Sequence, residues 1–387
     1  MKYADRVSRL GTETAFELLA KAKRLEAEGK DIIHLEIGEP DFITPRNIMD
    51  AAVKAMYEGH THYTGSAGDW GMRNRYADYL NQRYNASLDG ENIVITPGAK
   101  PVLFLSALAL IDPGAEVIYP DPGYPIYHSV VEFLEATAKP YHLREESGFR
   151  VDVEELRSLV SERTRVMIVN SPANPTGGML TREDWQVIID LAMEYGFWVL
   201  SDEIYSRIIY EGEHVGVMHF PEAFDRVVLL DGHSKTYAMT GWRLGYACCN
   251  KELAGYLTKL MTNANSCAAA FTQIAGAEAL HGDQSAVEEM VREFDRRRKL
   301  IVRLMNELPG VSCHNPKGAF YVFPNFKSYG RTSRELQQIF LENGVACLAG
   351  TSFGAAGEGY MRFSYANSVE NIERAVERVA GVLNTLR

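Results

Sequence analysis

The chain has 387 residues, of which 46% are hydrophobic and 24% are charged, and its formal net charge is −11. This length suffices for a large core and predicts either two domains or one large domain with a smaller one. The 40 basic residues are outnumbered by 51 acidic ones, which disfavours binding to nucleic acids or to anionic membranes.

The five cysteines form no C-x-x-C pair and have no histidine nearby at a spacing typical of zinc sites. Their odd number favours reduced thiols and therefore a cytoplasmic protein. The N-terminus lacks the apolar segment of a signal peptide, and no apolar run is long enough to cross a membrane. We expect a cytoplasmic enzyme without a metal ion.

The first part of the chain predicts two helices and a short strand. Residues 12–28 have a helical pattern that places Phe16, Leu18, Leu19, Ala22 and Leu25 on one apolar side. Residues 32–35 predict a strand. Thr44 and Pro45 are typical of the N-cap and first position of a helix, which we expect to continue to residue 58.

The middle of the chain alternates short, continuous apolar strands with helices. The strands are expected over residues 92–96, 116–119, 165–170, 197–201, 227–230 and 244–249. Such strands are typical of an α/β fold in which helices cover both faces of a mostly parallel sheet.

Beyond Ser285 the pattern changes to that of a smaller α+β domain. A charged helix is expected over residues 286–308, followed by strands at 319–323, 345–348 and 360–365. The basic run 296–299 follows several acids and is typical of a solvated helix face. We therefore predict a large domain over residues 46–284 and a small domain formed by residues 1–45 and 285–387.

Ligands of open α/β sheets bind beyond the carboxyl ends of the strands. The segments that follow the expected strands have the sequences PGAK, DPGYP, NSPANPTGG, DEIY and GHSK. Together they would form one polar, aromatic site able to bind phosphate. No G-x-G-x-x-G and no GxxxxGK[ST] occurs, which argues against a dinucleotide or P-loop site.

The stretch GHSKTYAMTGWRLGY contains two cations, Lys235 and Arg243, among small and apolar residues. A lysine shielded from water has a lowered pKa and can form a Schiff base. The alternatives are a lysine that extends to the surface and an arginine in an ordinary ion pair. The PGAK turn precedes a helix, so the N–H groups of Ala99 and Lys100 form either an anion cradle or a simple tight turn.

Four further residues each have a structural and a functional interpretation. Asp202 ends an apolar strand and either pairs with a cation or caps the next turn; Tyr205, three residues later, would face the same pocket. Tyr124 is either a loop aromatic or a ring on which a heterocycle stacks. Arg362 lies in an apolar strand, where its guanidinium requires a carboxylate from the protein or from a substrate.

These motifs together resemble class I aminotransferases, the aspartate-aminotransferase-like enzymes of fold type I that use pyridoxal 5′-phosphate. The lysine stretch and, in family order, GEPDF, HYTGSAG, PGAK, DPGYP, NPTG, SDEIY and MRFSYA carry the resemblance, which extends over residues 30 to 380. It implies a large domain with a mostly parallel seven-stranded sheet flanked by helices, and a smaller α+β domain.

The resemblance also implies a role for each residue around the cofactor ring. Lys235 would carry pyridoxal phosphate as a Schiff base and move the proton of the reaction. Asp202 would pair with the pyridine nitrogen, Tyr205 and Asn174 would bind the 3′ oxygen, and Tyr124 would stack on the ring.

The phosphate and the substrate have their own implied partners. The N–H groups of Ala99 and Lys100, the Ser234 hydroxyl and Arg243 would hold the phosphate; Gly232 stands where several branches of the family have a serine. Tyr63 would reach the phosphate of the neighbouring subunit, which implies a homodimer with shared active sites. Arg362 would bind the substrate α-carboxylate, assisted by Gly38 and Asn174.

The implied reaction is transfer of an amino group from an L-amino acid to a 2-oxo acid, by ping-pong kinetics through pyridoxamine phosphate. Other pyridoxal phosphate reactions, such as carbon–sulfur β-elimination or a cyclopropane-forming elimination, remain alternatives. A cofactor-binding sensor joined to a DNA-binding module would need an additional N-terminal domain. Aspartate, alanine, branched-chain and aromatic donors all remain open, because no second cation for a side-chain carboxylate stands out.

Overall fold

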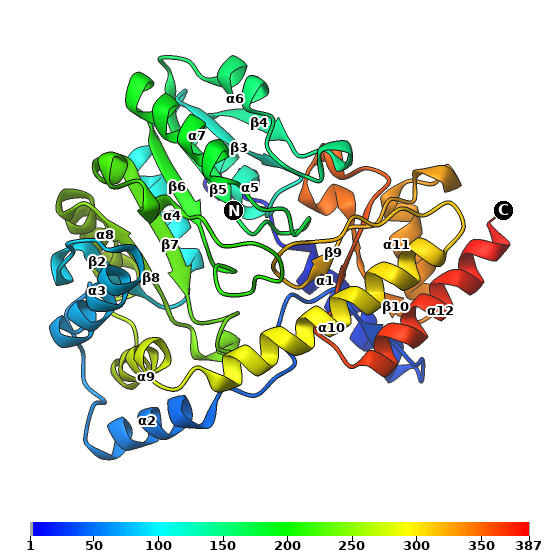
Figure 1. Cartoon of the computed structure of the whole chain (residues 1–387), viewed down its shortest axis with the longest axis horizontal. Coiled ribbons are helices and arrows are strands. Elements are labelled where there is room, and N and C mark those ends of the chain that lie inside the picture. Colours follow the sequence, from blue (N-terminus) through cyan, green and yellow to red (C-terminus); the bar gives the residue numbers. More distant parts are fainter. Residues whose placement is uncertain (1–2, 387) are drawn as a thin grey trace.

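A seven-stranded sheet forms the centre of the computed structural model, which describes residues 3–386 (Figure 1). The strand order is β2-β8-β7-β6-β5-β3-β4, and β8 runs antiparallel to both neighbours while the other pairs are parallel. The strands are β2 (Ile93–Thr96), β3 (Glu116–Asp121), β4 (Thr137–His142), β5 (Thr164–Asn170), β6 (Trp198–Asp202), β7 (Val227–Gly232) and β8 (Gly245–Cys249). The predicted mostly parallel α/β sheet is confirmed.

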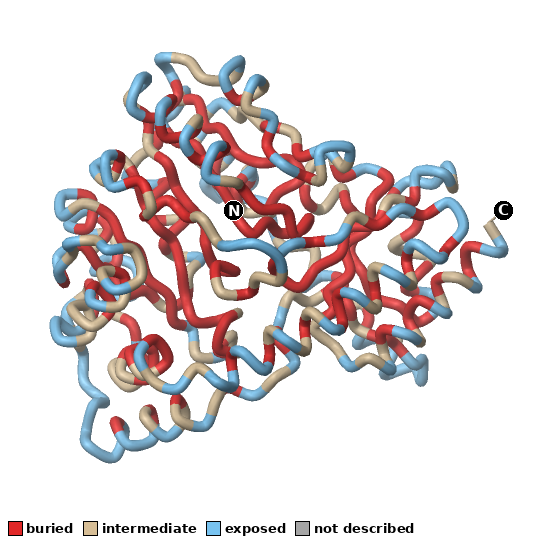
Figure 2. The backbone as a smooth tube through the Cα atoms, viewed as in Figure 1, coloured by how far each residue is buried: buried red, intermediate tan, exposed pale blue. Residues whose placement is uncertain are grey.

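Helices cover both faces of this sheet because alternate strand residues point to opposite sides. In β5, Val166 and Ile168 pack into the core formed with α4, α5 and α8, whereas Met167 and Val169 pack with α2, α3, α7 and α9. These helices are α2 (Arg46–Tyr57), α3 (Trp70–Tyr84), α4 (Lys100–Leu110), α5 (Ile126–Phe133), α6 (Val153–Leu159), α7 (Arg182–Tyr195), α8 (Lys251–Ala264) and α9 (Ala270–His281). Buried backbone accordingly runs through the sheet, and exposed backbone lies on the outer helices (Figure 2).

The C-terminal part forms a second, smaller α+β assembly around the strands β11-β12-β9. Its strands are β9 (Tyr321–Val322), β11 (Leu348–Ala349) and β12 (Met361–Ser364), and its helices are α10 (Ser285–Glu307), α11 (Ser333–Glu342) and α12 (Val369–Thr385). The N-terminal helix α1 (Thr14–Ala27) packs against it, and β1 (Ile33–His34) pairs with β10 (Val345–Ala346). The division at residues 46 and 285 stays a prediction.

Two expectations about local structure are wrong. Pro45, not Thr44, is the N-cap of α2, because the Thr44 hydroxyl donates to the Ala238 carbonyl, 2.7 Å away, in the lysine stretch. The basic run 296–299 is not a wholly solvated face: Arg296 and Lys299 are exposed, but Arg297 and Arg298 are only 7% and 2% exposed. Arg297 pairs with Asp41 at 2.7 Å, and Arg298 likewise has carboxylate partners, so buried charges are compensated.

Within residues 3–386, no helix has the length and apolar composition of a membrane span, and no group of His, Cys, Asp and Glu side chains is arranged to hold a metal ion. The five cysteines, at positions 248, 249, 267, 313 and 347, are all free thiols.

Candidate active site

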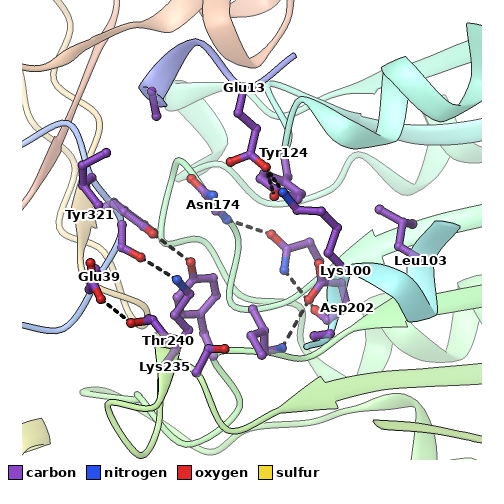
Figure 3. A pocket seen from close by; sticks show the side chains of 18 of the residues that line it. Glu13, Glu39, Lys100, Leu103, Tyr124, Asn174, Asp202, Lys235, Thr240 and Tyr321 are labelled. Atoms are coloured by element: carbon purple, nitrogen blue, oxygen red, sulfur yellow. Dashed lines mark hydrogen bonds and ion pairs between the residues drawn. The ribbon is translucent and has the colours of Figure 1, made fainter. Parts of the chain in front are cut away.

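A cavity of about 510 Å³ lies at the carboxyl ends of the parallel strands and is bordered on the other side by residues of the N-terminal segment and the C-terminal assembly. It is lined by every predicted site residue except Tyr63: Gly38, Ala99, Lys100, Tyr124, Asn174, Asp202, Tyr205, Ser234, Lys235, Arg243 and Arg362. Figure 3 shows the side chains of Lys235, Asp202, Asn174 and Tyr124 in this pocket, from separate segments of the chain. The strand-end rule therefore located the cavity correctly.

The register of the sheet explains why these residues meet. Asp202 is the last residue of β6 and lies beside Asn170, the last residue of β5. Gly232 ends the adjacent β7, so Ser234 and Lys235 follow at the same edge. Parallel strands that end together place the residues after them side by side.

The turn between β2 and α4 has the shape of an anion cradle. A Cβ on Gly98, which has φ +96°, would lie 2.3 Å from Arg243 Nη2, and a Cβ on Gly245 would lie 2.4 Å from Ala99 N. Glycine at both positions thus lets the guanidinium and the backbone approach closely. The first N–H groups of α4 have no intrahelical acceptor, so together with Arg243 they suit a phosphate.

The surroundings of Gly232 leave little room for a side chain. A Cβ there would lie 3.1 Å from Gly245 Cα and 3.3 Å from Ala99 Cβ. A serine would therefore need a wider turn. The buried Ser234 also lines the cavity.

Lys235 has the environment of a reactive amine. Its Nζ donates to the Gly38 carbonyl at 2.5 Å. Burial lowers the pKa of the ammonium to about 8; the charges of Arg362 and Arg243 lower it too, while those of Glu39 and Glu13 oppose the shift. The neutral, nucleophilic form is consequently far more accessible at neutral pH than for an ordinary lysine.

Asp202 is buried without a cationic hydrogen-bond partner among the described residues. Its Oδ2 accepts from the Tyr127 hydroxyl at 2.7 Å, and its Oδ1 accepts from Ile204 N at 3.3 Å. Burial raises the pKa of this carboxyl to about 6, and the two hydrogen bonds oppose that shift. A protonated heterocyclic nitrogen would compensate the buried carboxylate.

Arg362 is 4% exposed and forms no ion pair with any carboxylate in residues 3–386. Nη1 donates to Asn174 Oδ1 at 3.1 Å and Nη2 donates to the Glu36 carbonyl, but Nε has no partner. The rings of Tyr321 and Phe353 flank the guanidinium at 4.4 and 4.9 Å. A buried, oriented arginine whose charge is left uncompensated is suited to an external carboxylate.

Tyr127, Tyr321 and Glu13 are among the cavity residues that the sequence analysis missed. Tyr127 binds Asp202, and Tyr321 shares a 2.8 Å hydrogen bond between its hydroxyl and that of Tyr205. Glu13 accepts from Tyr124 and contacts Lys100 (Figure 3). Of these, Tyr127 had a local signal, because it lies two residues after the DPGYP loop, at the start of the helix expected there.

The group implied by the resemblance fits this chemistry. The cavity offers a phosphate cradle, the Lys235 amine with its lowered pKa, and the buried Asp202 carboxylate for a ring nitrogen. The ring of Tyr124 also lines it. Tyr63 is 88% exposed and does not line the cavity. Tyr63 therefore neither contributes a group to the cavity of its own chain nor blocks that cavity.

Comparison with known proteins identifies the family of the chain. A family model described as aminotransferase class I and II matches residues 30–379. The chain is 40% identical to an aspartate aminotransferase of Pyrococcus horikoshii, over 98% of this chain and 97% of that protein. It is also 40% identical to a (5-formylfuran-3-yl)methyl phosphate transaminase of Methanocaldococcus jannaschii, over 95% and 96% of the two chains.

The fold agrees equally well with a solved structure. An aspartate aminotransferase from Thermus thermophilus, in complex with maleate, superposes with a TM-score of 0.95 at 34% identity, over 99% of this chain and all of that one. The relatives are transaminases, so the elimination alternatives are not favoured. The chain belongs to the class I and II aminotransferases and is a transaminase of fold type I that uses pyridoxal 5′-phosphate.

Proposed function

We propose that the chain exchanges amino groups between L-α-amino acids and 2-oxo acids by a ping-pong mechanism, with the substrate α-carboxylate on Arg362. The observation that carries this proposal is the buried guanidinium of Arg362, which has no carboxylate partner among residues 3–386 and opens onto the same cavity as Lys235. An α-amino acid carries the needed carboxylate one bond away from the carbon that must lose a proton.

Bound pyridoxal phosphate holds the amino group between the two half-reactions and withdraws electrons from the substrate α-carbon. Lys235 would hold the cofactor before substrate arrives, and its freed Nζ would take the proton from the substrate α-carbon and deliver it to the cofactor's C4′ carbon. The Asp202 carboxylate keeps the ring nitrogen protonated, because an unpaired buried anion beside it is unfavourable. Tyr127, donating to Asp202 at 2.7 Å, holds that carboxylate in place.

The remaining residues position the cofactor. The Gly98–Lys100 turn, with Ser234 and Arg243, binds the phosphate. Tyr124 covers one face of the ring, while Tyr205 and the Asn174 amide hold its 3′ oxygen. Gly38, whose carbonyl accepts from Lys235 Nζ, lies beside the substrate carboxylate. Tyr321 orients Tyr205 through their shared hydrogen bond.

A homodimer completes the proposed site. Ile43, Tyr57 and Tyr63, which lie within 21 residues of each other in the sequence, are 82%, 89% and 88% exposed. A second hollow, lined by Phe42, Ile43 and Trp242 among others, opens beside Arg243. A second copy of the chain covering this face would bury these side chains and bring its Tyr63 to the phosphate.

Sedimentation of the purified protein is expected to give the mass of a dimer at micromolar concentration. Tyr63→Phe should keep that mass but weaken cofactor retention, because the hydroxyl would no longer bind the phosphate. Tyr57→Phe, equally exposed, serves as the control. A fully active monomer would contradict the proposal.

The rate at which cofactor-free protein captures pyridoxal phosphate is expected to rise with pH through about 8 and then level off. Only the neutral amine attacks, and in this site the neutral form of Lys235 predominates above its lowered pKa. Stopped-flow absorbance between pH 6 and 10 measures this profile. A rate that continues to rise toward the ordinary lysine pKa would show that the amine is not desolvated.

The donor and acceptor pair can be found with a panel of amino acids against 2-oxoglutarate and pyruvate. Conversion of the bound cofactor to its amino form by an amino acid alone, and its return by a 2-oxo acid alone, would support ping-pong transamination. Release of pyruvate and ammonia from cystathionine, with no transfer to any 2-oxo acid, would overturn it.

The location of the enzyme in the cytoplasm stays a prediction, supported by its five free thiols.

A further inference from the structure

Glu13 extends an acidic side chain into the active-site cavity from the start of α1. Its Oε1 accepts from the Tyr124 hydroxyl at 2.6 Å and forms an ion pair with Lys100 Nζ. Glu13 occupies the N-cap position of α1, yet its side chain caps no helix N–H. The carboxylate thus binds residues that line the cavity and does not cap the helix.

The chain is anchored on both sides of Glu13. Before it, Gly11 N donates to Ser129 Oγ at 2.9 Å and Arg9 pairs with Glu135 at 2.7 Å, which ties the segment to α5. After it, α1 packs against β10 and β11 of the C-terminal assembly, where Lys21 bonds Gln338. The Glu13 side chain can therefore leave Lys100 by rotation about its own bonds while the backbone stays in place.

Lys100 is a cation available to a substrate side chain. Arg362 is oriented for the α-carboxylate, Arg243 lies at the phosphate cradle, and Lys235 carries the cofactor. Lys100 Nζ lies 5.9 Å from the centre of the Tyr124 ring. Its charge is already neutralised by Glu13, so a substrate carboxylate must compete with an internal one.

Resting on the transamination proposed above, we propose that Glu13 is an internal counter-ion of Lys100, displaced by substrates with a side-chain carboxylate and retained with neutral side chains. The two halves of a ping-pong reaction pass through one cavity, which must accept both kinds of side chain whenever only one of the two substrates has a side-chain carboxylate. With Glu13 in place the cavity presents a neutral, partly aromatic wall; with Glu13 turned away it presents an ammonium. Glu13 is in this sense a residue that determines specificity.

A substrate carboxylate should be able to displace the Glu13 carboxylate from Lys100. The Glu13 side chain is 16% exposed and that of Lys100 is 45% exposed, and ion pairs in contact with water are weak. Removing the Glu13 charge is therefore expected to strengthen the binding of dicarboxylates by about fivefold, the size of effect that such a pair produces. Ligands without a second carboxylate should bind unchanged within about twofold.

Isothermal titration of the holoenzyme with succinate and with butyrate tests this directly, because the two differ by one carboxylate. Glu13→Gln should tighten succinate but not butyrate, and the same variant should raise kcat/KM for aspartate relative to asparagine through KM. Glu39→Gln is the matched control: Glu39 lines the same cavity but bonds Thr240 instead of Lys100. When Lys100→Met is added to Glu13→Gln, the gain in succinate affinity should disappear.

Equal succinate affinity in wild type and Glu13→Gln would overturn the inference, as would equal tightening by Glu39→Gln. If the amide variant folds poorly, Glu13→Ala provides the same charge removal, and its succinate-to-butyrate ratio decides between the same two outcomes. If neither wild type nor variants transfer an amino group from any amino acid, the proposed function itself fails. That result is separate from the succinate ratio, which needs no turnover.

Discussion

Lys235→Ala is expected to lower the rate of the amino acid half-reaction by about 10²- to 10⁴-fold, the usual contribution of a positioned acid–base group. The variant would lose both the amine proposed to carry the cofactor and the group proposed to move the α-proton. Single-turnover absorbance of the variant reconstituted with pyridoxal phosphate measures the loss. Borohydride treatment followed by peptide mass analysis should label Lys235 in the wild type and no residue of the cavity in the variant.

Lys100→Ala is the control for this experiment. Lys100 lines the same cavity, but its Nζ pairs with Glu13, whereas Lys235 Nζ faces the Gly38 carbonyl and has a lowered pKa. Borohydride should therefore still fix the cofactor to Lys235 in the Lys100→Ala protein. Full activity of Lys235→Ala, or labelling of Lys100 in its place, would show that the assigned amine is wrong.

The sheet and the floor of the site could be predicted because their signals are local. Strands such as residues 165–170 are apolar on both faces, which is typical of buried parallel strands. Once the strands are placed, the residues after them must meet at one edge, and Asn170 and Asp202 are indeed register partners. The pairing of the strands therefore brings residues that are far apart in the sequence together at one site.

Elements with mixed composition were harder to predict. β4 contains Lys139 and Pro140 and was not expected, but it lies at the edge of the sheet, where a missing N–H costs little. α3 was also not expected, since its mixed sequence WGMRNRYADYLNQRY has a weak apolar pattern. In both cases tertiary packing supplies what the local sequence lacks.

The part of the cavity that contains Glu13 could not be predicted, because its contacts join residues far apart in the chain. Glu13 meets Lys100 and Tyr124 at separations of 87 and 111 residues. Likewise Arg297 is compensated by Asp41, 256 residues away, so a single sequence makes the arginine look solvated. Charge pairs of this kind leave no periodic signal, whereas a strand or a helix does.

Arg362→Leu is expected to reduce kcat/KM for α-amino acids by about 10²- to 10⁴-fold. The guanidinium would form two charge-assisted hydrogen bonds with the substrate α-carboxylate, each worth roughly 1.5–3 kcal/mol. Leucine also leaves Asn174 Oδ1 and the Glu36 carbonyl without their donor. Half-reaction kinetics with alanine measures the loss, and absorbance should show that the cofactor remains bound, because Arg362 is not part of the phosphate cradle.

Ethylamine separates a binding role from a general structural one, since it is alanine without the carboxylate. Its slow reaction with the cofactor should be nearly unchanged in Arg362→Leu if the guanidinium acts only through the carboxylate. Arg362→Lys should recover little, because an ammonium is a point charge that cannot reproduce the planar fork held between Tyr321 and Phe353. An equal loss for alanine and ethylamine would mean that the arginine stabilises the fold of the site and leaves the carboxylate to another group. The discrimination between these two substrates therefore tests whether the uncompensated charge of Arg362 is the reason that this cavity selects α-amino acids.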